Sequence, residues 1–275
     1  MQKMVTPQRI VLVVIDGLRA DALTAAPTPE IDRLIARGAS TMTAQAVMPS
    51  VTLPCHVSIF YGTLPTQHGV TSNTWQTPRT PETGLLQLAH QAGLDTAALY
   101  TWEPLRDLAP PGTLDLAYLR RLGEPEDNRV YEIADLAAQY LACSQHALAF
   151  VYLEATDQAG HRFGWMSERY LDAVVKCDRA IGTIVAALEQ AGTLSETIIL
   201  VTSDHGGHDT HHGTAMQEDL TVPWIIAGPG IRARHGIRQD IDITATAPTL
   251  LHLLGIDIPA DWTGTVPTEI LESNS

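Results

Sequence analysis

The feature that most constrains this fold is an apolar, β-branched run that ends in metal-capable side chains. Residues 198–202 have the pattern of a strand buried on both faces, and Asp204, His205 and two glycines follow. The glycines let the backbone turn sharply, and open α/β sheets bind ligands at the carboxyl ends of their strands. Taken alone, the same residues could form an ordinary polar turn, so the case for a site depends on whether other strands end alike.

Two further predicted strands do end in this way. Residues 9–15 run into Asp16, and residues 147–153 are followed closely by Asp157. If these strands are parallel to the first, three carboxylates converge on one rim of the sheet. Carboxylates buried together are costly and repel one another unless cations lie between them. The three strand ends therefore predict a cation-binding rim.

Histidines complete a mixed set of candidate metal ligands. Nitrogen ligands are offered by His161, His205 and one member of the cluster His208, His211 and His212. Carboxylate and imidazole together suit zinc, manganese or iron better than calcium or magnesium alone. Six or more ligands are enough for two divalent ions, so we expect a two-metal centre.

A candidate nucleophile precedes a short buried helix predicted over residues 57–62. Thr52 is expected at or near the N-cap of this helix, with Pro54 in the first turn, where proline is tolerated. The threonine could serve only as a cap. Beside a divalent cation, however, a hydroxyl ionises readily and becomes a nucleophile, and a helix N-terminus favours anionic groups.

These motifs occur together in one order along the chain. They are Val14-Ile15-Asp16-Gly17, Thr52-Leu53-Pro54-Cys55-His56, Pro65-Thr66-Gln67-His68-Gly69-Val70 with Asn73, Asp157-x-x-x-His161, Asp204-His205-Gly206 and His212-Gly213. From Val11 to about Gly255 the chain resembles the type I phosphodiesterase/nucleotide pyrophosphatase family of the alkaline phosphatase superfamily. The resemblance implies an α/β fold with a doubly wound, mostly parallel central sheet and helices on both faces.

The resemblance also implies how the ligands divide between two divalent ions. One ion would be held by Asp16, Asp204, His205 and the Thr52 oxygen, and the other by Asp157, His161 and His212. His212 is preferred over its neighbours because Gly213 follows it, as in the family pattern. Zinc is the expected metal, with manganese or iron as alternatives. His56 and His68 are expected to be structural.

The implied reaction is a two-step hydrolysis of a phosphate ester. Thr52 would attack phosphorus and form a phosphothreonine, which is then hydrolysed. The amide of Asn73 and the backbone N–H of Leu53 would contact the phosphoryl oxygens. The resemblance therefore predicts an enzyme, a phosphodiesterase or nucleotide pyrophosphatase that acts on a small-molecule substrate.

Departures from the family pattern keep other substrates open. Leu53 stands where nucleotide pyrophosphatases usually carry an aromatic residue that stacks on the base. Trp75, Trp102 or Tyr152 could replace it, although isolated aromatic residues are more often part of the core. A sulfatase is disfavoured because Cys55 lacks the Cys-x-Pro-x-Arg context. A phosphomonoesterase or phosphonate hydrolase with the same site, and a non-catalytic metal-binding relative, remain as alternatives.

Composition indicates one catalytic domain over residues 1–275. The chain is 45% hydrophobic and has a formal charge of -14, which argues against nucleic-acid polymers and anionic membranes as partners. Residues 103–128, rich in proline, glycine and charge, are expected to form an irregular surface excursion. The three cysteines do not have the regular spacing of a disulfide framework, which fits a reducing compartment. Together with the lack of a signal-peptide pattern, they predict a cytoplasmic location. The sequence leaves the oligomeric state open.

Overall fold

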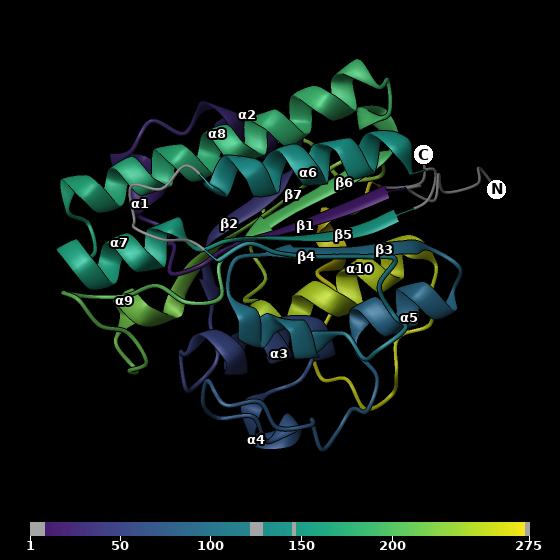
Figure 1. Ribbon diagram of the computed structural model, residues 1–275, viewed down its shortest axis with the longest axis horizontal. Helices are drawn as coiled ribbons and strands as arrows, with labels where there is room; N and C mark the ends of the chain where they lie inside the picture. Colours follow the sequence, from purple (N-terminus) through teal and green to yellow (C-terminus); the bar gives the residue numbers. More distant parts are fainter. Residues whose placement is uncertain (1–8, 122–128, 145–146, 273–275) are drawn as a thin grey trace.

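The computed structural model describes residues 9–121, 129–144 and 147–272, which form a central sheet covered by helices on both faces (Figure 1). Within these ranges the sheet has eight strands in the order β4-β3-β5-β1-β6-β7-β2-β8. The strands are β1 (Arg9–Ile15), β2 (Ala39–Gln45), β3 (Asp95–Tyr100), β4 (Leu116–Leu119), β5 (Ala147–Leu153), β6 (Thr197–Thr202), β7 (Thr221–Ala227) and β8 (His235–Gly236). All neighbouring strands are parallel except that β7 runs antiparallel to β6 and β2. The predicted doubly wound, mostly parallel sheet is confirmed.

Helices cover the two faces unequally (Figure 1). One face carries α1 (Ala22–Ala25), α2 (Pro29–Arg37), α6 (Arg129–Cys143), α7 (Ala155–Phe163) and α8 (Glu168–Gln190). The other carries α3 (Thr52–Tyr61), α5 (Leu85–Gln91) and α10 (Thr246–Leu254), with α4 (Pro65–His68) further out, while α9 (Gln217–Leu220) precedes β7. In the described part of the chain, no helix is long and apolar enough to cross a membrane.

The strand at the centre of the sheet shows why these residues form a buried sheet. Along β1, Ile10, Leu12 and Val14 pack into the core on one face, and the alternate residues pack into the core on the other. Side chains that alternate between two covered faces require a continuous apolar run, which is the pattern of β1. The same explanation holds for β5 and β6.

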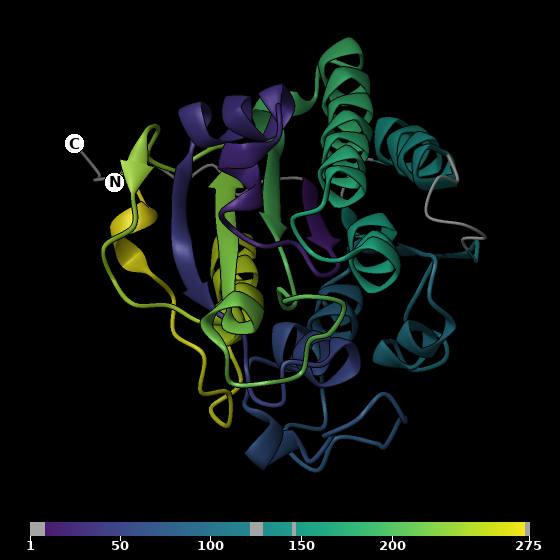
Figure 2. The ribbon, with the colours of Figure 1, turned by 90° about the vertical axis from the view of Figure 1, so that its left-hand side faces the viewer.

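The register of the central strands places their ends side by side. Ile15 of β1 pairs with Leu153 of β5, and Val14 pairs with Thr202 of β6. The segments that follow the three strands therefore start at the same edge of the sheet, which faces the viewer in Figure 2. This edge carries the candidate site.

The segment expected to be an irregular excursion contains regular structure. A 3₁₀ helix spans Glu103–Leu108, and β4 pairs in parallel with β3 at the border of the sheet. The expectation was wrong there because pairing with a neighbouring strand outweighs the weak propensity of a short segment. Residues 122–128 of the predicted excursion lie outside the described residues.

Candidate metal centre

The carboxylates predicted at three strand ends meet at one edge of the sheet. Asp16 follows β1 directly, Asp157 lies in the first turn of α7 just after β5, and Asp204 follows β6. The side chains of Asp16 and Asp204 are buried, and that of Asp157 is 13% exposed. Gly17 has a φ of +67°, and a Cβ there would lie 3.1 Å from the Cα of Asp157. Glycine therefore lets the chain after Asp16 pass close beside Asp157.

Asp16, Asp204 and His205 form the first group of candidate ligands, all buried. The Nε2 atom of His205 lies 3.3 Å from the Oδ1 atom of Asp16 and 3.4 Å from the Oδ2 atom of Asp204. The hydroxyl oxygen of Thr52 lies 3.3 Å from the same Nε2 atom. The structure thus brings together the four residues predicted to hold one ion.

Asp157, His161 and His212 form the second group. The Oδ1 atom of Asp157 lies 3.5 Å from Nε2 of His161 and 3.8 Å from Nε2 of His212. The two groups adjoin, because the rings of His205 and His212 are stacked with centroids 3.8 Å apart. Each predicted ligand set is therefore assembled, and the two sets are neighbours.

Buried oxygens in both groups lack hydrogen-bond partners. Within the described structure this applies to Oδ1 of Asp16, Oδ1 of Asp157 and Oδ2 of Asp204, the atoms that face the imidazoles. A buried carboxylate oxygen without a partner is costly. Divalent cations between these oxygens and the imidazoles would remove that cost, so the residues fit a two-metal centre.

The three imidazoles are oriented as metal ligands usually are. Each Nδ1 atom lies within hydrogen-bond distance of a backbone carbonyl: His161 with Thr210 at 3.0 Å, His205 with Gly206 at 2.8 Å and His212 with Ser50 at 2.9 Å. Because a carbonyl can only accept, each neutral ring carries its proton on Nδ1 and presents the lone pair of Nε2. Such a bond fixes the tautomer and the ring orientation of metal-binding histidines.

The electrostatics of the site also favour bound cations. Burial raises the pKa of Asp16 well above its usual value, and the negative charges of Asp204 and Asp157 raise it further. Burial also raises the pKa of Asp157, again with Asp204 adding to the effect. Burial and the nearby His205 lower the pKa of His212 to about 4. Bound cations would lower the raised pKa values of Asp16 and Asp157, since positive charge favours the ionised carboxylate.

Thr52 is the first residue of α3, and the N-cap is Val51. It therefore lies next to the N-cap, as expected, and since no side-chain capping bond is made at this helix end, the alternative that Thr52 serves only as a cap is not supported. Its hydroxyl faces His205 instead. One turn along, Nδ1 of the buried His56 donates to the carbonyl of Thr52 over 2.8 Å and lies 3.4 Å from Oδ2 of Asp204. His56 therefore connects the start of α3 with Asp204 of the first group of candidate ligands.

Asn73 lies beside the start of α3, and its side-chain oxygen binds the backbone N–H that was predicted to contact a phosphoryl oxygen. The backbone N–H of Leu53 donates to Oδ1 of Asn73 over 2.9 Å. That N–H is therefore engaged and not available for a phosphoryl oxygen. The bond holds the exposed side chain of Asn73 at the N-terminus of α3, and its amide N–H groups are left to serve as donors.

The remaining histidines have other partners. His68 accepts from the N–H of Val70, and its Nε2 lies 3.0 Å from the hydroxyl of Ser58, as expected for a structural residue. His211 lies 3.3 Å from the hydroxyl of Thr210. His208 contacts Asp219 over 2.7 Å. Neither His208 nor His211 belongs to the two ligand groups.

The sequence patterns did not identify Asp219 as a residue of the site. It is fully buried and accepts from the backbone N–H and the hydroxyl of Thr214, each over 2.8 Å, as well as from His208. These bonds tie together the loop that carries His212. The available signal was an acidic residue two positions before the apolar strand β7.

Tyr152 is not a stacking platform. It is fully buried, and its hydroxyl donates to Oδ2 of Asp16. Trp75 and Trp102 are half-buried and pack against the core on the α3 side of the sheet. Tyr152 is therefore a partner of a candidate metal ligand, a role that the sequence did not indicate.

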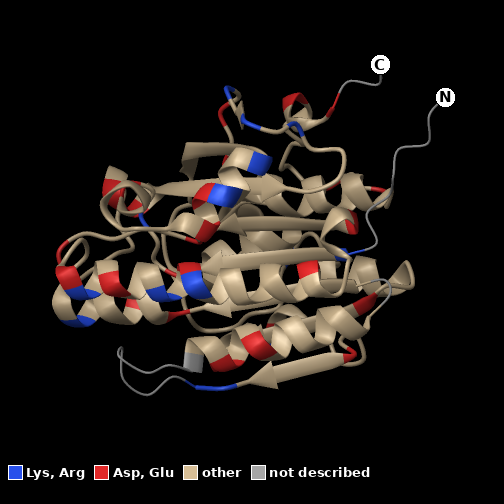
Figure 3. Ribbon diagram, turned by 90° about the horizontal axis from the view of Figure 1, so that it is seen from above, with Lys and Arg blue, Asp and Glu red and all other residues tan. Residues whose placement is uncertain are grey.

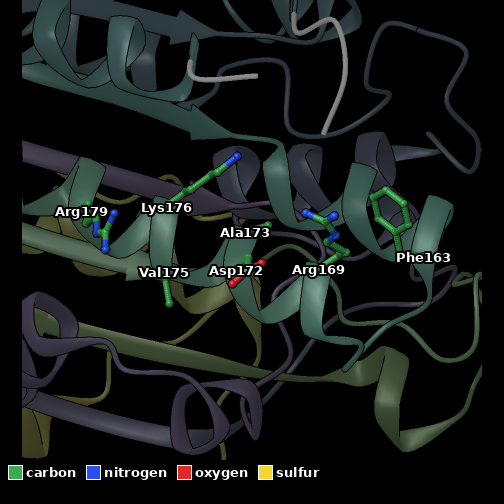
Figure 4. Close-up of a pocket in the computed structure, with 7 residues that line it drawn as sticks. All are labelled: Phe163, Arg169, Asp172, Ala173, Val175, Lys176 and Arg179. Atoms are coloured by element: carbon green, nitrogen blue, oxygen red, sulfur yellow. The ribbon is translucent and has the colours of Figure 1, made fainter. Parts of the chain in front are cut away.

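Apart from the two ligand groups, the surface has a hollow along α8 (Figure 4). It is lined by Phe163, Arg169, Asp172, Ala173, Val175, Lys176 and Arg179, none of which belongs to the ligand groups. Several of the basic residues seen from this side lie on α8 (Figure 3).

The family model described as type I phosphodiesterase / nucleotide pyrophosphatase matches residues 10–236. The chain belongs to this family. The description of the family and the names of the relatives are those of hydrolases that act on ester bonds.

Curated relatives include both phosphodiesterases and sulfatases. Ectonucleotide pyrophosphatase/phosphodiesterase family member 3 of Mus musculus is 26% identical over 224 residues, covering 73% of this chain and 25% of that protein. Arylsulfatase K of Bos taurus is 34% identical over 100 residues, covering 34% of this chain and 18% of that protein. The family member described here thus corresponds to a quarter or less of the length of these two relatives.

Solved structures share the fold. An inactive murine ectonucleotide pyrophosphatase / phosphodiesterase 5 in complex with AMP matches with a TM-score of 0.81 and 16% identity, covering 96% of this chain and all of that one. A 2-O GAG sulfatase matches with a TM-score of 0.77 and 17% identity, covering 96% and 74%. The alkaline phosphatase-like fold is confirmed.

Proposed function

We propose that this family member is a metal-dependent phosphodiesterase that uses Thr52 as its nucleophile on a small-molecule phosphate ester. The observation that carries the proposal is the position of the Thr52 hydroxyl, 3.3 Å from Nε2 of His205 and beside two adjoining ligand groups. A hydroxyl at a helix start, next to ligands for divalent ions, is where an ionised nucleophile would be stabilised.

Two divalent ions are proposed cofactors. Asp16, Asp204, His205 and Thr52 would hold one, and Asp157, His161 and His212 the other. Zinc is the proposed metal because carboxylate and imidazole ligands in small sets suit it, with manganese or iron as alternatives. Bound ions would supply Lewis acidity toward the phosphoryl oxygens and the nucleophile.

The residues of the chain would perform two displacements. In the first, Oγ1 of Thr52 loses its proton and forms a bond to phosphorus as the bond to the leaving alkoxide breaks, and the alkoxide takes up a proton and departs as the alcohol. In the second, water attacks the phosphothreonine, which releases a phosphate monoester and restores the threonine. Asn73, held by the N–H of Leu53, would donate to a phosphoryl oxygen.

The charge of the site favours a diester over a monoester. A diester carries one negative charge and a monoester carries two near neutral pH. Arg19 comes close in sequence to Asp16, but its guanidinium pairs with Asp21 over 2.6 Å and donates to the carbonyl of Gly207. It therefore does not replace the arginine that grips a monoester in classical alkaline phosphatases. A phosphomonoesterase or phosphonate hydrolase with the same site is the alternative.

The sulfatase relatives raise a further candidate, because a sulfate ester is also a monoanion. Arylsulfatase K of Bos taurus supports it over 34% of this chain. Thr52 opposes it, since a threonine cannot supply the aldehyde that formylglycine chemistry needs. We therefore propose phosphate diesters, in preference to sulfate esters, as the substrate class.

The test compares hydrolysis of bis(p-nitrophenyl) phosphate, p-nitrophenyl phosphate and p-nitrophenyl sulfate by the zinc- or manganese-loaded protein. Thr52→Ala is the variant, and Thr52→Ser, which keeps a hydroxyl, is its matched control. We expect the diester to be cleaved fastest, activity to vanish in Thr52→Ala and part of it to remain in Thr52→Ser. Dominant cleavage of either other ester, or full activity in Thr52→Ala, would refute the proposal.

A further inference from the structure

Trp165 lies against both imidazoles of the second ligand group. Its side chain is almost buried, and its ring centroid is 5.1 Å from that of His161 and 5.9 Å from that of His212, both with edge-to-face geometry. The indole therefore restricts the rotation of both rings. Edge-to-face ring contacts of this kind are favourable beyond the area that they bury.

The same side chain is tied to the first ligand group. The indole N–H donates to the carbonyl of Gly17 over 2.9 Å, and Gly17 is the residue after Asp16. The hydroxyl of Tyr170 donates to that carbonyl as well, over 2.9 Å. Trp165 thus connects the loop that carries Asp16 with the two imidazoles of the other group.

Two glycines make room for the indole. A Cβ at Gly160 would lie 2.5 Å from a ring carbon of Trp165, and a Cβ at Gly207 would lie 2.2 Å from one. Gly160 precedes His161, and Gly207 comes two residues after His205. The backbones on either side of the ligands therefore approach the indole more closely than any other residue type would allow.

We infer that Trp165 is a positioning residue that sets His161 and His212 for the second ion and is itself anchored by its bond to the carbonyl of Gly17. The inference rests on the proposed two-metal centre but does not depend on which ester the enzyme cleaves. Its consequence is that the affinity for one ion depends on the indole although the indole is not a ligand.

Trp165→Phe is the decisive variant, because it keeps a flat ring but removes the N–H and the second ring. Trp262→Phe is a matched control: Trp262 is also 7% exposed, like Trp165, but it packs against Gly62 and not against the ligands. Metal-free proteins are titrated with Zn²⁺ by calorimetry in the presence of a competing chelator. Partners of metal ligands typically contribute 10–100-fold to affinity.

We expect Trp165→Phe to weaken one of two binding steps by about tenfold or more and to leave the other nearly unchanged. His161→Ala should abolish the same step, which identifies it. Trp262→Phe should bind both ions as the wild type does. The absorption bands of bound Co²⁺ report ligand geometry, and they should change in Trp165→Phe but not in Trp262→Phe. Should Trp165→Phe not fold, Trp165→Tyr provides the same comparison.

Wild-type affinity for both ions in Trp165→Phe, or equal weakening in Trp262→Phe, would overturn the inference. A wild-type protein that takes up no zinc would overturn it together with the proposed metal centre. Two bound ions, a weakened step in Trp165→Phe and no cleavage of any ester would refute the proposed function alone and leave the role of Trp165 standing.

Discussion

Asp219→Ala tests whether the loop that carries His212 is held by a single buried carboxylate. Asp219 accepts three hydrogen bonds, two from Thr214 and one from His208, over 2.7–2.8 Å. A hydrogen bond to a charged group contributes about 1.5–3 kcal/mol. Thr214 is exposed and His208 partly so, and their donors can recover bonds to water. We therefore expect the free energy of unfolding to fall by about 3 kcal/mol, which is the upper end of the range for one such bond and well below the sum for three.

The magnitude can be measured as a change in melting temperature. For a chain of this size 1 kcal/mol corresponds to roughly 2–4 °C, so the Tm of metal-free Asp219→Ala should fall by about 6–12 °C. Although burial opposes it, hydrogen bonds from His208 and Thr214 lower the pKa of Asp219 below its usual value. The contribution of Asp219 is thus present above about pH 4 and lost as the pH falls through the folded-state pKa.

Asp242→Ala is the matched control. Asp242 likewise accepts from the backbone N–H and the hydroxyl of a threonine two residues on, Thr244, but it caps a helix turn away from the ligands. Both variants should be less stable than the wild type. Only Asp219→Ala should also weaken zinc binding, because its loop presents His212. Unchanged Tm in Asp219→Ala, or equal loss of zinc affinity in Asp242→Ala, would refute the reasoning.

Three other outcomes are expected. Asp157→Ala and Asp204→Ala should abolish ester hydrolysis in assays with excess zinc, and full activity in either would remove that residue from the ligand set. Removing metal with EDTA should lower the Tm, because unpaired buried carboxylates are left behind; an unchanged Tm after verified metal removal would contradict a preformed centre. Burial lowers the pKa of His68 to about 4, so stability should decline as the pH falls from about 6.5 to 4. His68→Gln should flatten this part of the curve measured by denaturant titration, and an equally steep decline in the variant would assign it to other groups.

Local pattern alone was enough for the elements that carry the site. The runs that became β1, β5 and β6 are continuous and apolar because both of their faces are covered, so their ends could be located without coordinates. Parallel pairing then had to bring Asp16, Asp157 and Asp204 to one edge. The choice of His212 within its cluster came from the family pattern, and the structure places it, and neither His208 nor His211, in a ligand group.

The supporting contacts were decided by tertiary structure. Tyr152 meets Asp16 across 136 positions of sequence, Ser50 meets His212 across 162, and Trp165 meets Gly17 across 148. No local propensity reports such pairs, because strand register and helix packing set which side chains point at one another. The sequence by itself therefore determined which groups can bind metal and on which strands they lie. Only the packed structure decided how most of those groups are oriented, since the directions of Asp16, His161 and His212 depend on partners distant in the chain.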